Sequence, residues 1–319
     1  MKSNRSIAAD GLLGRQNQPY FAHHDLIAAA NTALLLEMPL LLTGEAGCGK
    51  TEFAWAAAQQ LAGAEPFSFY VRSDSVSRDL LYRYDSLLRY GESQYGTDAE
   101  RRDRADVRRY LTLEALGKGL CSPHESVVLI DEIDKAPRDL PNDLLRELEQ
   151  GEFEIAELPE LPVANAKLDI DDPFTFNRLM KKPDGKPRPL IIITSNVERQ
   201  LPDPFLRRCI FYHIQFPGAE QLRQILQARF PGETPIVDQS ICIFTTLRNV
   251  SGLTKKPATS ELINWVQAII GFHRDANSTL QAAVVSVENK KRVQWSSLPA
   301  LCCLIKLRED RELLGLDVS

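Results

Sequence analysis

Short apolar runs alternate along this chain with longer segments in which apolar residues recur every three or four positions. Helical spacing is present in residues 24–37 (HDLIAAANTALLLE) and 51–62 (TEFAWAAAQQLA), on either side of the apolar run PLLLT. We predict β-strands in this run, residues 39–43, and in residues 67–72, 126–132, 190–194 and 209–216. Strands that alternate with helices favour an α/β domain built on a parallel sheet.

The pattern changes at about residue 217, where the strand-like runs end. Four apolar-faced segments with helical spacing follow, at residues 219–230, 240–250, 259–273 and 298–310. We therefore predict two domains, an α/β core over residues 1–216 and a small helical lid over residues 217–319. A chain of 319 residues agrees with this count.

The glycine-rich string GEAGCGKT lies between the first predicted strand and the following helix. It has the spacing G-x-x-x-x-G-K-[ST], with Gly44, Gly49, Lys50 and Thr51 at the defining positions. Glycines let the backbone curl so that successive N–H groups point at phosphate oxygens, and the following helix adds its positive N-terminus. We expect Lys50 to reach the β- and γ-phosphates and Thr51 to coordinate Mg²⁺.

Two acidic residues follow the buried strand predicted in ESVVLIDEIDKA. Ligands bind at the carboxyl end of an open parallel sheet, which is where Asp131 and Glu132 would lie. Asp131 is a candidate for holding Mg²⁺, and Glu132 for orienting and deprotonating the water that attacks the γ-phosphate. A solvated acidic turn would explain this pair alone, but not together with a phosphate-binding loop.

Polar residues also follow the apolar run LIIIT, at Ser195 and Asn196. Asn196 both donates and accepts hydrogen bonds, so it is a candidate for holding the attacking water or the γ-phosphate. Further along, Arg207 and Arg208 directly precede the last predicted strand. They form ordinary ion pairs, or one of them reaches the nucleotide of a neighbouring subunit and neutralises charge in the transition state.

Composition narrows the class of protein. The chain has 38 basic and 43 acidic residues, a net charge of −5, which gives no global attraction to nucleic acid or anionic membranes. We expect a cytoplasmic protein, because there is neither an apolar signal core near the start nor a run long enough to span a membrane. The six cysteines are expected to be buried free thiols, and neither they nor the five histidines have metal-site spacing.

Taken in order, GEAGCGKT, VVLIDEIDKAPRDLPNDLLRELEQGEFEI, IIITSN and LPDPFLRRCIFYHIQFP are similar to the MoxR family of AAA+ ATPases, over most of residues 20–220. The resemblance implies a five-stranded sheet in the order 5-1-4-3-2 and a ring of identical subunits, commonly a hexamer, with ATP at the subunit boundaries. It implies Mg²⁺ ligation by Thr51 and Asp131, catalysis by Glu132 and Asn196, and Arg208 as the arginine finger, with Arg207 where relatives often carry an acid. It assigns nucleotide binding to Gly44, Glu45, Ala46, Gly47, Cys48, Gly49, Lys50, Thr51 and Glu52.

The chain departs from related ATPases where their lid supplies a basic residue called sensor 2. The corresponding helix opens with KKPATSELINW and has no arginine. Lys255 or Lys256 is a candidate for this role, and we count Lys256 among the candidate nucleotide-binding residues. An ammonium is a poorer bidentate partner for phosphate than a guanidinium. Two solvated lysines before a helix are the simpler interpretation.

Two segments lie where such proteins carry insertions. Residues 73–96 correspond to a helix 2 insert, and residues 157–188 to an extended pre-sensor 1 insert in which a hairpin is expected. Both are candidate partner surfaces. For the second, a mobile substrate-engaging loop and a disordered connector are equally compatible with the sequence.

We therefore expect a Mg²⁺-dependent ATPase that remodels or activates a partner protein. The resemblance suggests a partner with a von Willebrand factor A domain. The alternative hypothesis is a nucleotide-gated regulatory or assembly module, in which ATP binding rather than turnover is the output; the absence of a sensor 2 arginine favours it. A nucleic-acid-linked motor is disfavoured by the acidic charge balance.

Overall fold

A computed structural model describes residues 5–93, 106–159, 176–196, 199–272, 277–289 and 293–316 of the chain. These residues belong to two compact units, which are described separately. The first unit comprises Met1–Arg15, Ala22–Thr43 and Lys50–His213. The second unit comprises Gln16–Phe21, Gly44–Gly49 and Ile214–Ser319.

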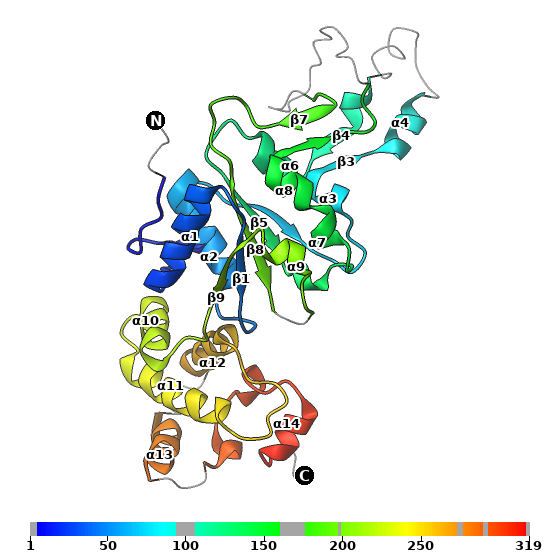
Figure 1. The fold of residues 1–319 in the computed structure, drawn as a ribbon. Helices are drawn as coiled ribbons and strands as arrows, with labels where there is room; N and C mark the ends of the chain where they lie inside the picture. Colours follow the sequence, from blue (N-terminus) through cyan, green and yellow to red (C-terminus); the bar gives the residue numbers. More distant parts are fainter. Residues whose placement is uncertain are drawn as a thin grey trace. The chain divides into compact units, whose positions relative to one another are not determined.

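The first unit is built on a parallel five-stranded sheet with the order β2-β5-β8-β1-β9 (Figure 1). Its strands are β1 (Leu40–Thr43), β2 (Phe67–Tyr70), β5 (Val127–Asp131), β8 (Leu190–Ser195) and β9 (Ile210–His213). This confirms the predicted strand order, 5-1-4-3-2, when the five strands are counted along the chain. The last strand ends at His213, three residues earlier than predicted.

The strand register aligns the carboxyl ends of the central strands. Leu40 of β1 pairs with Ile192 of β8, and Ile130 of β5 pairs with Ile193 of β8. Residues one position further along β5 and β8 are Asp131 and Thr194, so the register brings them side by side. The polar ends of these strands thus meet at one edge of the sheet.

Helices cover both faces of this sheet. Because side chains alternate along a strand, Val128 and Ile130 of β5 share one face, and they are buried in one cluster with Leu116, Leu140 and Phe205 of the following helices. Helix α2 contacts β5 and β8, and α1 contacts β1 and β9. The helices of this unit are α1 (His24–Leu36), α2 (Lys50–Ala62), α3 (Ser77–Leu81), α4 (Ser86–Ser93), α6 (Ala115–Cys121), α7 (Leu140–Asp143), α8 (Leu145–Gln150) and α9 (Asp203–Leu206).

Two short antiparallel pairs lie at the predicted insertions. Strand β3 (Tyr82–Tyr84) pairs with β4 (Leu111–Leu113), next to α3 and α4. Strand β6 (Glu152–Glu154) pairs with β7 (Leu179–Lys181), which agrees with a hairpin before the fourth sheet strand. Residues 94–96 of the first predicted insertion and residues 160–175 of the second lie outside the described residues.

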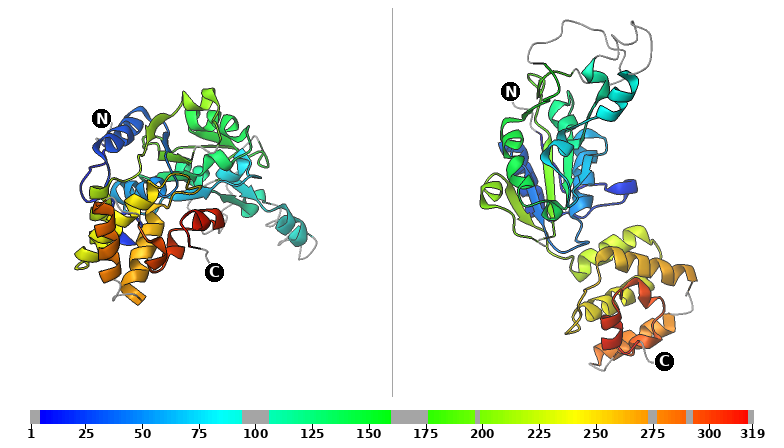
Figure 2. Two further views of the ribbon diagram at one scale, coloured as in Figure 1. Left: turned by 90° about the horizontal axis from the view of Figure 1, so that it is seen from below. Right: turned by 90° about the vertical axis from the view of Figure 1, so that its right-hand side faces the viewer.

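The second unit consists mainly of helices (Figure 2). They pack around one buried cluster that includes Trp265 and Phe244. Its helices are α10 (Ala219–Arg229), α11 (Thr234–Arg248), α12 (Thr259–Phe272), α13 (Asn277–Glu288) and α14 (Arg308–Leu313). Helix α11 begins six residues before the predicted segment, with Pro235 in its first turn, where proline is well tolerated. Helix α13 was not predicted.

The continuous helix predicted at residues 298–310 is wrong. This stretch contains a 3₁₀ turn, Leu301–Cys303, and the first residues of α14. Leu298 is extended (φ −79°, ψ 133°), as expected before Pro299, and Ala300 is left-handed with φ 53°. Proline therefore interrupts an apolar pattern that by itself resembles a helix.

All six cysteines are free thiols, as predicted, but the prediction that they are buried holds for only some of them. Cys48, Cys121 and Cys209 are buried, whereas Cys302 is exposed. None of the helices in the described part of the chain combines the length and the apolar character that crossing a bilayer requires.

Candidate nucleotide site

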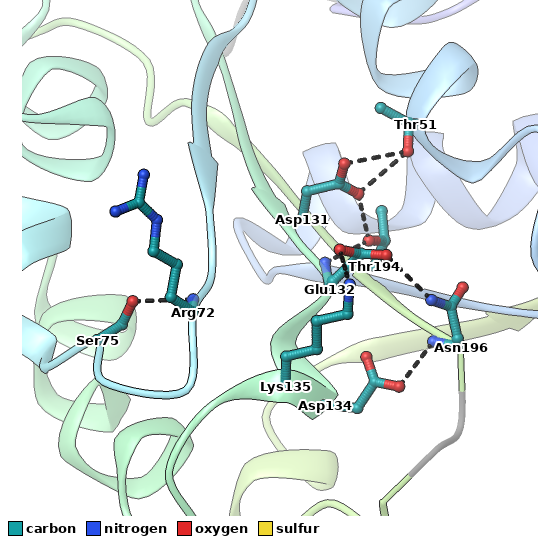
Figure 3. Close-up of polar contacts among 9 residues, drawn as sticks. All are labelled: Thr51, Arg72, Ser75, Asp131, Glu132, Asp134, Lys135, Thr194 and Asn196. Atoms are coloured by element: carbon teal, nitrogen blue, oxygen red, sulfur yellow. Dashed lines mark hydrogen bonds and ion pairs between the residues drawn. The ribbon is translucent and has the colours of Figure 1, made fainter.

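A cluster of polar side chains lies at the carboxyl edge of the sheet, at the ends of β5 and β8 (Figure 3). The hydroxyl of Thr51, in the first turn of α2, donates to Asp131 with distances of 3.1 and 3.2 Å to its two carboxylate oxygens. Asp131 is only 7% exposed. The two residues predicted to hold Mg²⁺ are therefore in direct contact although 80 positions separate them.

Thr194 joins the two acids and was not identified from the sequence. Its hydroxyl donates to Asp131 Oδ1 at 2.6 Å and accepts a hydrogen bond from the backbone N–H of Glu132 at 2.9 Å. Thr194 is completely buried. The signal that could have revealed it is a hydroxyl at the end of the otherwise apolar run LIII.

Glu132 adopts a left-handed backbone conformation, with φ 60° and ψ 51°, directly after the strand. This conformation is uncommon for a residue with a side chain and occurs often at functional sites. Asn196 Nδ2 donates to Glu132 Oε1 at 3.3 Å, and Lys135 Nζ lies 2.6 Å from Glu132 Oε2. The structure thus brings together the two residues predicted to handle the attacking water.

Asn196 is itself held by the loop that follows β5. Its backbone N–H donates to Asp134 Oδ2 at 3.0 Å, and Asp134 is buried. Figure 3 shows the side chain of Asn196 directed at Glu132 while its backbone faces Asp134. Neither Asp134 nor Lys135 was singled out from the sequence, although both belong to the acidic motif.

The phosphate-binding loop connects β1 to α2 along the chain. Lys50, the first residue of α2, is 6% exposed, which is unusual for a lysine. Gly44, Gly47 and Gly49 all have positive φ, at 146°, 75° and 97°. A Cβ atom at Gly47 would lie 2.6 Å from the Cβ of Ala258, so this turn requires glycine.

The family model described as AAA domain (dynein-related subfamily) matches residues 39–209. The chain belongs to this AAA family. The matched residues include four of the five sheet strands, the phosphate-binding loop and both polar motifs, and they end at Cys209, directly before β9. No curated protein matches the sequence.

The second unit supplies an arginine at the loop that the sequence analysis missed. Arg248, the last residue of α11, donates from Nη2 to Glu45 Oε2 at 2.6 Å and lies over the ring of Phe216, 3.5 Å from its centroid. Its side chain is 11% exposed. Nothing in the local pattern distinguishes Arg248 from an ordinary basic residue at a helix C-terminus.

The two lysines proposed as sensor 2 differ in their contacts. Lys255 Nζ lies 3.4 Å from Glu261 Oε1, and its backbone N–H donates to Asp310. Lys256 is exposed. Arg248, by contrast, contacts the phosphate-binding loop through Glu45.

Arg207 and Arg208 lie between α9 and β9 of the AAA domain and have different surroundings. Arg208 forms an ion pair with Glu149 through Nε and donates from Nη1 to the carbonyl of Pro204 at 3.0 Å. Arg207 is exposed. Glu52, which lies in α2, is the last residue predicted to bind nucleotide. Its carboxylate accepts a hydrogen bond from the backbone N–H of Arg15.

The structure brings together one group of potential metal ligands that the spacing of the histidines did not indicate. The ligand atoms of His23, His24 and Asp25 lie within 4.8 Å of one another at the start of α1. All three residues are exposed, and the partial positive charge of a helix N-terminus disfavours a cation there. The sequence analysis missed the group because the residues are consecutive and have no zinc-type spacing.

Proposed function

We propose that this AAA domain hydrolyses ATP with Mg²⁺ and that hydrolysis drives the remodelling of a partner protein. The observation that supports turnover most directly is the arrangement of two neighbouring acids. Asp131 contacts Thr51, whereas Glu132 contacts Asn196. This arrangement supports a role of Asp131 at the metal and of Glu132 at the attacking water.

The residues present fit Mg²⁺. Thr51 and Asp131 offer hydroxyl and carboxylate oxygens, the ligand type that Mg²⁺ prefers, and Thr194 orients the carboxylate from behind. When bound, Mg²⁺ would supply positive charge that neutralises the charge developing on the phosphates of ATP. Lys50 adds a second positive charge at the start of α2.

Glu132 would orient the attacking water and accept its proton. In the described structure the Glu132 carboxylate contacts Lys135 and Asn196, so a water can bind to a remaining acceptor site or exchange with Lys135. Lys135 and Glu132 are 45% and 36% exposed, and exposed pairs contribute only about 0–1 kcal/mol. Exchanging the Lys135 contact for a water therefore costs little free energy.

The test is phosphate release by purified protein with and without Mg²⁺, comparing wild type with Glu132→Gln. We expect turnover to fall by about 10²-fold or more while ATP affinity changes little. Asp139→Asn removes the same charge from an exposed residue outside the cluster and should behave as wild type. Wild-type turnover no faster than that of Glu132→Gln would exclude hydrolysis and favour the nucleotide-gated assembly module.

Ring formation and the partner are further parts of the proposal and rest on the resemblance to MoxR ATPases. Arg208 is the proposed arginine finger, acting on the nucleotide of the next subunit of a homo-oligomeric ring, commonly a hexamer. Mixing Arg208→Ala with Lys50→Ala subunits should restore activity at those boundaries where an intact Lys50 faces an intact Arg208. No recovery in mixed rings would argue against action between subunits.

The proposed partner is a protein with a von Willebrand factor A domain. A pull-down with the Glu132→Gln variant in ATP should capture such a protein if ATP-bound rings hold it. A large, salt-sensitive stimulation of turnover by DNA or RNA would instead support a nucleic-acid motor.

A further inference from the structure

The guanidinium of Arg208 is already occupied within its own subunit. It is ion-paired with Glu149, at the end of α8, and donates to the carbonyl of Pro204. Arg208 and Glu149 are 37% and 50% exposed. An arginine held in this way is restrained by its own subunit until these contacts are released.

Glu149 is in turn held in place by a second arginine. Arg188 donates from Nη1 to the carbonyl of Glu149 and from Nη2 to that of Gln150, both at 2.8 Å. Its Nε lies 3.6 Å from Glu37. These contacts cap the C-terminus of α8, where exposed carbonyls favour positive charge. The backbone that carries Glu149 is thereby anchored.

Glu149 also links Arg208 to the β6–β7 hairpin. Only Gln150 and Gly151 separate it from β6, and Gly151 is left-handed with φ 71°. A displacement of this hairpin would reach Glu149 through these two residues. The second strand of the hairpin, β7, lies within residues 157–188, the insertion that the sequence marks as a candidate partner surface.

We infer that Glu149 is the resting partner of Arg208 and a positioning residue for the proposed ATPase. Engagement of a neighbouring nucleotide then exchanges the Glu149 carboxylate for a phosphate, which carries more charge and more acceptors. Because both partners are exposed, the pair is weak enough to be exchanged. This inference rests on the proposed role of Arg208 as arginine finger.

The test measures ATP turnover per subunit over a range of protein concentrations for Glu149→Gln. Two quantities are obtained: the maximal turnover per subunit, and the protein concentration at which half of this maximum is reached. Removing the competing carboxylate should raise the first divided by the second by about two- to five-fold, the size expected for an exposed ion pair. In an Arg208→Ala background the same substitution should have no effect. Thermal unfolding should be nearly unchanged, because Glu149 is half exposed.

Glu154→Gln is the matched control. Glu154 is 49% exposed and pairs with Arg146 Nη2 at 3.7 Å, so the substitution removes an equivalent charge from a pair that does not involve Arg208. An unchanged or lowered ratio in Glu149→Gln, or an equal rise in Glu154→Gln or in the Arg208→Ala background, would overturn the inference. If Arg208→Ala alone retains wild-type turnover, the arginine finger assignment is wrong and the inference falls with it.

Discussion

The hydroxyl of Thr194 donates to the carboxylate of Asp131 over 2.6 Å, and both side chains are buried. The parallel register of β5 and β8 places these residues side by side. Since the same hydroxyl accepts from the N–H of Glu132, one threonine contacts both the carboxylate of Asp131 and the backbone of Glu132. Orientation by such supporting contacts commonly determines how well a metal site performs.

Thr194→Val removes this hydroxyl with little change of volume. We expect the free energy of unfolding to fall by about 1–3 kcal/mol, because Asp131 and the N–H of Glu132 each lose a buried partner. ATP binding should also require more Mg²⁺. Urea unfolding and nucleotide titrations at several Mg²⁺ concentrations measure both effects. Thr194→Ser keeps the hydroxyl and should restore the Mg²⁺ dependence; identical behaviour of the two variants would contradict this role.

Asn196→Ala should separate chemistry from binding. Its amide contacts Glu132, whereas its backbone N–H, which the substitution keeps, contacts Asp134. We expect turnover to fall by about 10²-fold, the usual cost of losing one positioned donor, with ATP affinity nearly unchanged. Single-turnover kinetics and equilibrium titration distinguish these quantities. A loss of affinity without a loss of turnover would place Asn196 in ground-state binding instead.

Arg248→Ala tests the contact between α11 and the phosphate-binding loop. Without the guanidinium, Glu45 brings an unbalanced negative charge to a loop expected to bind phosphates. ATP affinity should weaken by about three- to ten-fold. Unfolding should become easier, because the stacking on Phe216 is also lost.

Glu45→Gln in the Arg248→Ala background separates these two effects. Removing the unbalanced carboxylate should recover most of the ATP affinity but none of the lost stability. Affinity that stays low in the double variant would mean that Arg248 acts through packing alone.

Two buried thiols predict a pH dependence of stability. Burial raises the pKa of Cys121 and of Cys209 from 9.0 to about 12. The contribution of these protonated thiols to the free energy of unfolding is fully present below pH 9. It is lost as the pH rises from 9 through 12, because the thiols ionise in the unfolded chain before they ionise in the folded protein. In that pH range, each thiol should lower the free energy of unfolding by about 1.4 kcal/mol per pH unit.

Urea unfolding from about pH 8 to about pH 11 measures this slope. Cys121→Ala and Cys209→Ala should each reduce this slope. With a thiol reagent at neutral pH, Cys302 should react first. Rapid modification of Cys121 in the native protein would contradict its burial.

The resemblance to the MoxR family implied the strand order, whereas the sequence by itself determined the α/β fold and the residues of the acidic and phosphate-binding motifs. These follow from local properties: apolar runs of strand length, helical periodicity, and glycines at fixed distances from Lys50 and Thr51. The local pattern was misleading where a proline opposed it, as at Pro299, since apolar spacing continues across a residue that interrupts a helix.

Only the tertiary structure decided which side chains support these motifs. Thr194 meets Asp131, Arg248 meets Glu45, and Arg208 meets Glu149, across 63, 203 and 59 positions of the chain. Strand register and helix packing create these contacts, and neither is encoded in the spacing of neighbouring residues. The motif residues could therefore be named in advance, whereas their partners required the folded chain.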